Sequence, residues 1–139
     1  ISTKDSWFWH TGMGLRSLDT LKAMYHASVG ANSNLLLGVM PDNTGQLPSD
    51  QVELLAQFGD FVRTCYGPQA AAANWSGSGN VVTLNLGTDG VVIDRIVLQE
   101  DQSGGQQVAQ FSIQVEPNGG YRETLVPAGN GTAVGNKRI

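Results

Sequence analysis

The stretch NSNLLLGVMPDNTGQLP, residues Asn32 to Pro48, decides the fold of this chain. Its apolar run from Leu35 to Met40 predicts a strand buried on both faces, as in parallel sheets with helices on either side. The turn-forming residues PDNTG at 41–45 end this strand. Helical patterns precede and follow the stretch, so helix, buried strand, polar loop and helix make one repeat of a β/α architecture. Because the loop after the strand borders the active site in such folds, the stretch predicts the edge of an enzyme site.

The two flanking helices are predicted from apolar periodicity and from signals at their ends. Ser17 is a candidate N-cap, and the first helix is expected to end at Gly30. The second helix is expected from Ser49 to Tyr66, with Asp50 near its positive end and Gly67-Pro68 closing it. The recurring apolar positions are Leu18, Leu21, Tyr25 and Val29 in the first helix and Val52, Leu55, Phe58, Gly59 and Val62 in the second.

The second half of the chain changes to the period of two that is typical of strands. The small residues of 68–80 predict a connector. After it, short alternating runs separated by glycine turns predict an antiparallel β-sandwich with a jelly-roll-like arrangement. The expected strands are 81–86, 91–98, 108–115, 121–126 and 132–139, and the expected turns are 87–90, 103–105 and 118–120.

Composition limits the class of protein. The chain has 139 residues, 40% hydrophobic content and a formal net charge of −4. Phosphate binding needs clustered Lys and Arg, so this charge argues against a nucleic-acid partner. No apolar run reaches the roughly 18 residues that span a membrane, and neither a signal peptide nor an initiating Met is visible at Ile1. We therefore expect a processed or partial product that binds neither nucleic acid nor membrane.

Each half of the chain is too small to be complete. A unit of about 60 residues buries only about 60% of its unfolded surface, a single strand has no partner, and five sandwich strands leave open edges. We therefore expect a fold that is incomplete at both ends. Its partner is then the remainder of the same polypeptide or a companion chain.

One cysteine and two sequons are the candidate modification sites. Cys65 is the sole cysteine, which excludes a disulfide within the chain and any zinc or iron–sulfur spacing, and no metal or cofactor is expected. The thiol is interpreted as a small buried hydrophobe at the end of a helix. The sequons begin at Asn74 and Asn130, and together they favour a secreted, lysosomal or vacuolar route in a eukaryotic source.

A family resemblance is carried by short pieces that follow one another along the whole chain. In the first half these are WFWH at 7–10, SLDTL at 17–21, YHASVG at 25–30, NLLL at 34–37, PD at 41–42, TG at 44–45 and FGD at 58–60. In the second half they are RIVL at 95–98, QED at 99–101, GQ at 105–106, Val108, Phe111 and GNKRI at 135–139. With these pieces the chain resembles the α-L-fucosidases of glycoside hydrolase family 29, most closely their plant-type or bacterial branch.

The resemblance implies a (β/α)₈-like catalytic barrel that ends at residues 1–67, a connector at 68–80 and the N-terminal part of a β-sandwich at 81–139. It also implies a retaining exo-acting glycosidase that removes terminal α-L-fucose from glycans. In such enzymes an Asp nucleophile forms a covalent fucosyl intermediate and a second carboxylic acid serves as acid and base. Both carboxylates are expected outside this chain, so the fragment alone is expected to be inactive.

The densest aromatic cluster, Trp7 to His10, is the candidate substrate-binding segment. The resemblance implies that it lies near the sugar, where aromatic rings contact the C6 methyl and the C–H faces of fucose. Trp7, Trp9 and His10 are the candidate substrate-binding residues, without a choice between the two Trp. The alternatives are aromatic packing beneath the barrel rim and a structural role for His10.

Several polar positions outside that cluster have two interpretations each. Asp42 follows the predicted strand, where it either borders a site or forms the turn. His26 is expected to be a structural residue of the first helix. Arg95, with Glu100 and Asp101, either binds glycan in a sandwich module or forms a surface ion pair or a contact with the barrel.

More than one function is compatible with these residues, because the nucleophile is expected outside the chain. The first is part of an α-L-fucosidase acting on fucosylated glycans. The second is a non-catalytic carbohydrate-binding or structural glycoprotein with a fucosidase-like fold. A weaker third is an autonomous carbohydrate-binding module formed by residues 68–139.

Overall fold

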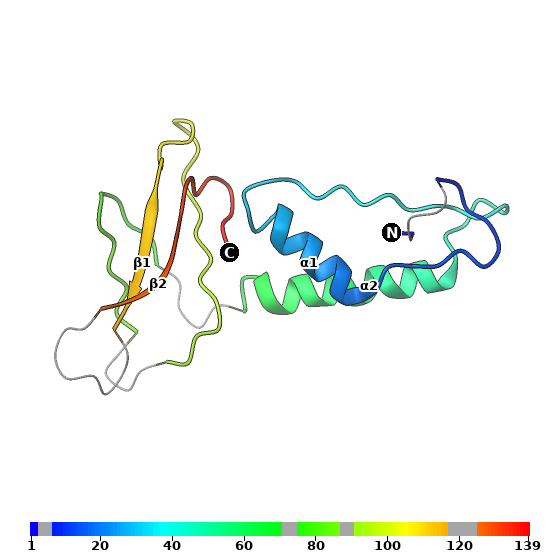
Figure 1. The fold of residues 1–139 in the computed structure, drawn as a ribbon, viewed down its shortest axis with the longest axis horizontal. Helices are drawn as coiled ribbons and strands as arrows, with labels where there is room; N and C mark the ends of the chain where they lie inside the picture. Colours follow the sequence, from blue (N-terminus) through cyan, green and yellow to red (C-terminus); the bar gives the residue numbers. More distant parts are fainter. Residues whose placement is uncertain (3–6, 71–74, 87–90, 117–124) are drawn as a thin grey trace. The chain divides into compact units, whose positions relative to one another are not determined.

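The chain divides into two compact units, Ile1–Ala70 and Ala71–Ile139, which we call the helical unit and the strand unit. The computed structural model describes residues 1–2, 7–70, 75–86, 91–116 and 125–139 (Figure 1). The division between the units falls inside the segment 68–80 that the sequence analysis interprets as a connector. That the units belong to a barrel and a sandwich stays a prediction at this point.

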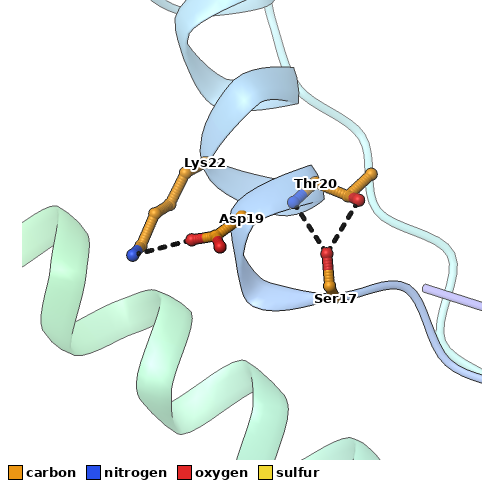
Figure 2. A network of polar contacts seen from close by, with 4 residues as sticks. All are labelled: Ser17, Asp19, Thr20 and Lys22. Carbon is orange, nitrogen blue, oxygen red and sulfur yellow. Dashed lines mark hydrogen bonds and ion pairs between the residues drawn. The ribbon is translucent and has the colours of Figure 1, made fainter.

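Helix α1 spans Leu18–Ser28 and begins as the sequence predicts. Figure 2 shows its first turn, where the Ser17 hydroxyl accepts a hydrogen bond from the backbone N–H of Thr20 at 3.2 Å. In the same turn the Lys22 ammonium pairs with the Asp19 carboxylate at 3.2 Å. At the other end, the N–H of Gly30 donates to the Tyr25 carbonyl at 3.0 Å. The N-cap and the termination near Gly30 are therefore confirmed, since both ends satisfy backbone groups that a helix leaves open.

Helix α2 spans Ser49–Tyr66, the range that the sequence predicts. Asp50 lies in its first turn, where a negative charge is stabilised by the helix dipole. The helix ends as the N–H of Gly67 donates to the Arg63 carbonyl at 3.0 Å. Pro68 follows, and it cannot continue a helix because it lacks an N–H.

The helices of the helical unit pack through an apolar core and an aromatic cluster. Leu21 of α1 is fully buried, and it packs with Ile1 and Leu54. Tyr25 is also buried, and its ring lies 5.3 to 6.2 Å from the rings of three α2 residues, Phe58, Phe61 and Tyr66. Complete burial of a leucine side chain contributes about 1.5–3 kcal/mol, so these contacts account for the pairing of the helices.

Residues Leu35 to Met40 depart from the sequence prediction. They are extended but form no strand. The sheet that the described residues contain joins two segments of the strand unit and does not include them. Leu35 and Leu37 are half-buried, whereas Leu36 is 93% exposed. The prediction of burial on both faces is therefore wrong for this chain. Leu37 packs against the helical core, and no described element covers Leu36 on the opposite face.

Among its described residues, the strand unit contains one two-stranded antiparallel sheet. Strand β1 spans Phe111–Val115 and strand β2 spans Val126–Gly131, with Phe111 opposite Gly131 and Val115 opposite Val126. The register shifts between Ile113 and Gln114, as at a bulge. A separate bridge joins Leu98 to Arg138 through two backbone hydrogen bonds of 2.8 and 2.9 Å.

The predicted pattern of five strands is largely wrong. Of the predicted range 108–115, the residues Phe111–Val115 form strand β1. β2 begins at Val126, the last residue of the predicted range 121–126, of which 121–124 lie outside the described residues. Among the described residues, 81–86 forms no strand, and the ranges 91–98 and 132–139 contribute only the bridge between Leu98 and Arg138. Val92 is 98% exposed, because an alternating pattern needs a partner strand before either face is buried.

Of the three predicted turns, one can be assessed. At 103–105, Gly105 has a φ of 84° and its N–H donates to the Gln102 carbonyl at 2.9 Å, so this turn is confirmed. A positive φ at this position suits glycine, which has no Cβ. The turns at 87–90 and 118–120 lie outside the described residues.

Candidate functional site

The loop Pro41–Pro48 follows the extended segment, and Asp42 organises it. The Asp42 carboxylate accepts hydrogen bonds from the Thr44 N–H at 2.8 Å, the Thr44 hydroxyl at 2.6 Å and the Gln46 N–H at 3.3 Å. The backbone closes the same turn, since the Asp42 N–H donates to the Gln46 carbonyl at 2.8 Å. The hydrogen bond from the Thr44 hydroxyl, with those from the two backbone N–H groups, lowers the pKa of Asp42. Its interpretation as a turn residue is confirmed.

Gln51, in the first turn of α2, joins this helix to the last residue of the extended segment, Met40. Its side-chain N–H donates to the Met40 carbonyl at 2.9 Å, and its side-chain oxygen accepts from the Met40 N–H at 3.2 Å. The residue is only 1% exposed. One amide therefore satisfies both backbone groups of Met40, as a neighbouring strand would.

The aromatic segment Trp7 to His10 lies in a loop with an ordered base. Ser2 and Leu15 form an antiparallel bridge, and the backbone nitrogen of Ile1 donates to the Gly38 carbonyl. The base of this loop is therefore attached to the extended segment two residues before Met40, at the end where the loop Pro41–Pro48 begins.

The side chains of the aromatic segment are largely open to solvent in this chain. Trp7 is 87% exposed, Phe8 is 78% exposed and Trp9 is half-exposed. His10 is exposed, and its Nδ1 lies 3.0 Å from the Thr11 carbonyl. Exposed large aromatic rings are available for apolar contact with a ligand or with further polypeptide. Whether they contact a sugar stays a prediction.

His26 joins the aromatic cluster between the helices. Its Nε2 lies 2.5 Å from the Tyr66 hydroxyl, and its ring lies 5.9 Å from that of Phe61 in an edge-on arrangement. This position agrees with the structural role expected from the sequence.

No group of three or more His, Cys, Asp or Glu among the described residues is placed to hold a metal ion. Cys65 has a free thiol and is half-exposed.

Glu100 is the organising residue of the strand unit. Its Oε1 accepts from the N–H groups of Gln107 at 2.5 Å and Val108 at 2.7 Å, while its Oε2 accepts from the Gly135 N–H at 3.0 Å. The backbone adds a fourth bond, from the Glu100 N–H to the Gly135 carbonyl at 2.9 Å. The N–H of Gln107 first, and then those of Val108 and Gly135, lower the pKa of Glu100.

The residues grouped with Glu100 by the sequence analysis take different partners. Arg95 pairs with the neighbouring Asp94, with its Nε 3.0 Å from Asp94 Oδ1. The Asp101 carboxylate accepts from the Ser103 N–H at 2.9 Å. Arg95 thus forms a surface ion pair, but with Asp94, which the sequence analysis did not name, while the carboxylates of Glu100 and Asp101 accept from backbone N–H groups.

Sequence reasoning missed the roles of both Gln51 and Glu100. A signal for Gln51 was present, since it precedes Leu54, Leu55 and Phe58 at the spacing of one helical face. A polar residue on such an apolar face needs a buried partner. No comparable signal exists for Glu100, because backbone N–H groups that lie seven to 35 residues away leave no trace in residue identity.

Comparison with known proteins places the chain beside fucosidases in both sequence and structure. A protein of rice named putative alpha-L-fucosidase 1 is 31% identical over 87 residues, which cover 63% of this chain and 17% of that protein. The crystal structure of a putative alpha-L-fucosidase from Bacteroides thetaiotaomicron superposes with a TM-score of 0.82 at 28% identity, over 98% of this chain and 30% of that one. The resemblance to the α-L-fucosidases is confirmed.

Further matches extend the resemblance to glycoside hydrolase family 29. Alpha-L-fucosidase 1 of Arabidopsis thaliana is 24% identical over the whole of this chain and 33% of its own length. The crystal structure of a family 29 protein, SpGH29, superposes with a TM-score of 0.71 at 26% identity, over 96% of this chain and 34% of that one. No family model matches the chain. The chain thus spans about a third or less of the length of each of these proteins.

The two sequons and the membrane prediction complete the comparison with the sequence analysis. Asn130 is exposed in β2, opposite Ser112, and Asn74 lies outside the described residues. Neither of the two described helices is long and apolar enough to cross a membrane.

Proposed function

We propose that this chain is part of a retaining exo-α-L-fucosidase that releases terminal α-L-fucose from glycans. The observation that carries the proposal is the superposition on one fucosidase structure over 98% of the chain, across both units. In this proposal the helical unit supplies the last strand and closing helix of a (β/α)₈-like barrel, and the strand unit begins a jelly-roll-like sandwich. The chain contributes substrate-binding surface, and the nucleophile and acid/base come from the remainder of the protein or a companion chain.

The described carboxylates support a location of the catalytic pair outside this chain. A retaining pair needs two carboxyl groups about 5–5.5 Å apart. Asp42 instead accepts from the Thr44 hydroxyl and two backbone N–H groups, and Glu100 accepts from three backbone N–H groups. These bonds lower the pKa of both groups, which disfavours the protonated form that an acid needs, and they occupy the oxygens that a nucleophile needs. The fragment alone is therefore proposed to be inactive.

The substrate-binding role is assigned to Trp7, Trp9 and His10. The exposed indole rings offer apolar faces to the C6 methyl group of fucose, and the His10 ring offers a nitrogen to a sugar hydroxyl. Exposed aromatic rings in a soluble protein have a solvation cost that a sugar can relieve. Trp7 is the more exposed of the two Trp, so it is the first to test.

The test is hydrolysis of an aryl α-L-fucoside by the protein at its native length. We expect turnover, and we expect Trp7→Ala and Trp9→Ala to raise KM by about tenfold, the loss of one good aromatic contact. Trp75→Ala is the matched control, because Trp75 is an exposed indole of the strand unit and is expected to leave KM unchanged. Fucoside binding without turnover would replace this proposal with the non-catalytic carbohydrate-binding glycoprotein.

We also propose that Asn74 and Asn130 carry N-linked glycans and that the protein is secreted or lysosomal/vacuolar. The exposure of Asn130 supports access to its side chain, although it lies in a strand. Intact mass before and after enzymatic deglycosylation of the natively produced protein tests this. An unchanged mass would contradict it.

A further inference from the structure

Gln51 makes a pair of hydrogen bonds that α2 does not need for its own stability. Its backbone N–H is already satisfied by the Asp50 carboxylate at 2.8 Å. Its side chain instead turns to Met40, eleven residues earlier, and bonds both the carbonyl and the N–H of that residue. Since Gln51 is nearly inaccessible to solvent, water does not compete for these bonds.

The bonds fix the point at which the extended segment becomes a loop. Met40 is the last residue before the loop Pro41–Pro48, so its position sets where the loop begins. Two residues later, the Asp42 carboxylate fixes the loop itself, because it accepts from the N–H groups of Thr44 and Gln46. Residues 43–47, which lie between Asp42 and α2 in the sequence, are exposed and therefore able to meet a ligand.

We propose that Gln51 is a positioning residue of the fucoside-binding site. Its amide holds the carboxyl end of the extended segment and thereby fixes the loop Pro41–Pro48 as a rigid wall of that site. The inference rests on the proposed function, because the carboxyl end of a barrel strand is where substrate binds. Gln51 acts through Met40 and does not itself contact substrate, since it lies beneath the surface.

The chemistry of the side chain defines the informative substitutions. Leucine has nearly the shape of glutamine but leaves the Met40 N–H and carbonyl without partners in a buried place. Glutamate accepts from the N–H, but its ionised form repels the carbonyl oxygen. Protonated glutamate again has one donor and one acceptor, so it matches the amide. Burial raises the pKa of a carboxyl group, which brings this protonated form into mildly acidic conditions.

The experiment compares Gln51→Leu and Gln51→Glu with Gln57→Leu in the protein at its native length. Gln57 is a matched control, because it lies on the same helix but is exposed and bonds only the Glu53 side chain, at 3.2 Å, among the contacts described. For Gln51→Leu we expect kcat/KM on an aryl α-L-fucoside to fall about tenfold, chiefly through KM, as expected for a misplaced binding wall. For Gln57→Leu we expect no change.

Two further readouts separate positioning from general destabilisation. Hydrogen–deuterium exchange at the Met40 amide is expected to accelerate in Gln51→Leu and not in Gln57→Leu. The KM of Gln51→Glu is expected to approach the wild-type value as the pH falls and to rise with pH, whereas Gln51→Leu shows no such recovery. This pH profile keeps the test valid where Gln51→Leu does not fold.

Each contrary result has one meaning. Faster exchange at Met40 with unchanged kcat and KM would overturn the positioning role and leave a purely structural bond. Unchanged exchange in Gln51→Leu, or a KM of Gln51→Glu that does not respond to pH, would also overturn it. A wild-type protein that neither turns over nor binds the fucoside would refute the proposed function, and the positioning role with it, while the exchange at Met40 would still report the bond.

Discussion

Different kinds of interaction stabilise the interior of each of the two units. The helical unit is built around buried apolar side chains, with Leu21 fully enclosed and the ring of Tyr25 packed against three aromatic rings of α2. The described part of the strand unit has a short sheet and many exposed apolar residues, and the Glu100 carboxylate accepts three backbone hydrogen bonds that join its segments.

The difference has a physical origin. A helix satisfies its backbone hydrogen bonds within itself, so a pair of helices needs only one shared apolar face to become compact. A strand depends on neighbours both for its backbone and for burial, and those neighbours can be distant in sequence or in other polypeptide. The helical unit therefore depends on apolar burial, while the strand unit depends on a few specific polar contacts.

Leu21→Ala should have the largest effect on the chain. Truncation of a fully buried leucine typically costs about 2–5 kcal/mol, because it removes apolar contacts and leaves a cavity. Leu125→Ala in the strand unit, where the side chain is 53% exposed, should change the free energy of unfolding by less than about 0.5 kcal/mol. Urea denaturation of the two variants measures both values. Equal costs would contradict the proposed difference between the units.

The second-largest effect concerns the Glu100 carboxylate, whose contribution to the stability of the strand unit depends on pH. The pKa of folded Glu100 is lowered from its ordinary value of 4.5. A lowered pKa in the folded state means that the carboxylate stabilises the fold fully above the ordinary value. This contribution is lost as the pH falls below 4.5 and through the lower folded value. We expect acid to release the amides of Val108 and Gly135 first.

Glu100→Gln tests this pH dependence. The variant should exchange the Val108 and Gly135 amides faster at neutral pH and should lose part of the acid sensitivity, because its side chain no longer titrates. Glu116→Gln is the control, since Glu116 is an exposed carboxylate at the end of β1. Hydrogen–deuterium exchange is measured for both variants between about pH 3 and pH 7, because this interval includes the titration of an ordinary carboxyl group. The same acid response in Glu100→Gln as in wild type would refute the role of the carboxylate.

Helix positions could be predicted from the sequence because their determinants are local. The Ser17 cap, the period of three to four residues and the Gly67-Pro68 ending act within one or two turns, and α2 has the predicted bounds. The turn at Asp42 was equally readable, since Asp bonds N–H groups only two and four residues ahead. These features need no knowledge of the rest of the fold.

Strand positions and the polar connections between segments could not be predicted in the same way. The run Leu35–Met40 is apolar enough for a strand, but a strand exists only where another backbone pairs with it. The bonds of Gln51 to Met40 and of Glu100 to Gly135 connect separate segments through backbone groups, which every residue type carries. Residue identity therefore predicts what must be buried or bonded, but not the partner.

The smallest effect on this chain should be at Leu36, and it tests how the chain is completed. Leu36→Ala in the 139-residue chain should change the free energy of unfolding by less than about 0.5 kcal/mol, because the side chain is 93% exposed. In a closed barrel the same side chain is covered, so at native length the substitution should cost about 2–5 kcal/mol. Urea denaturation of both lengths gives the difference. A small cost at both lengths would contradict the barrel assignment, because an interior strand of a barrel has no face open to solvent.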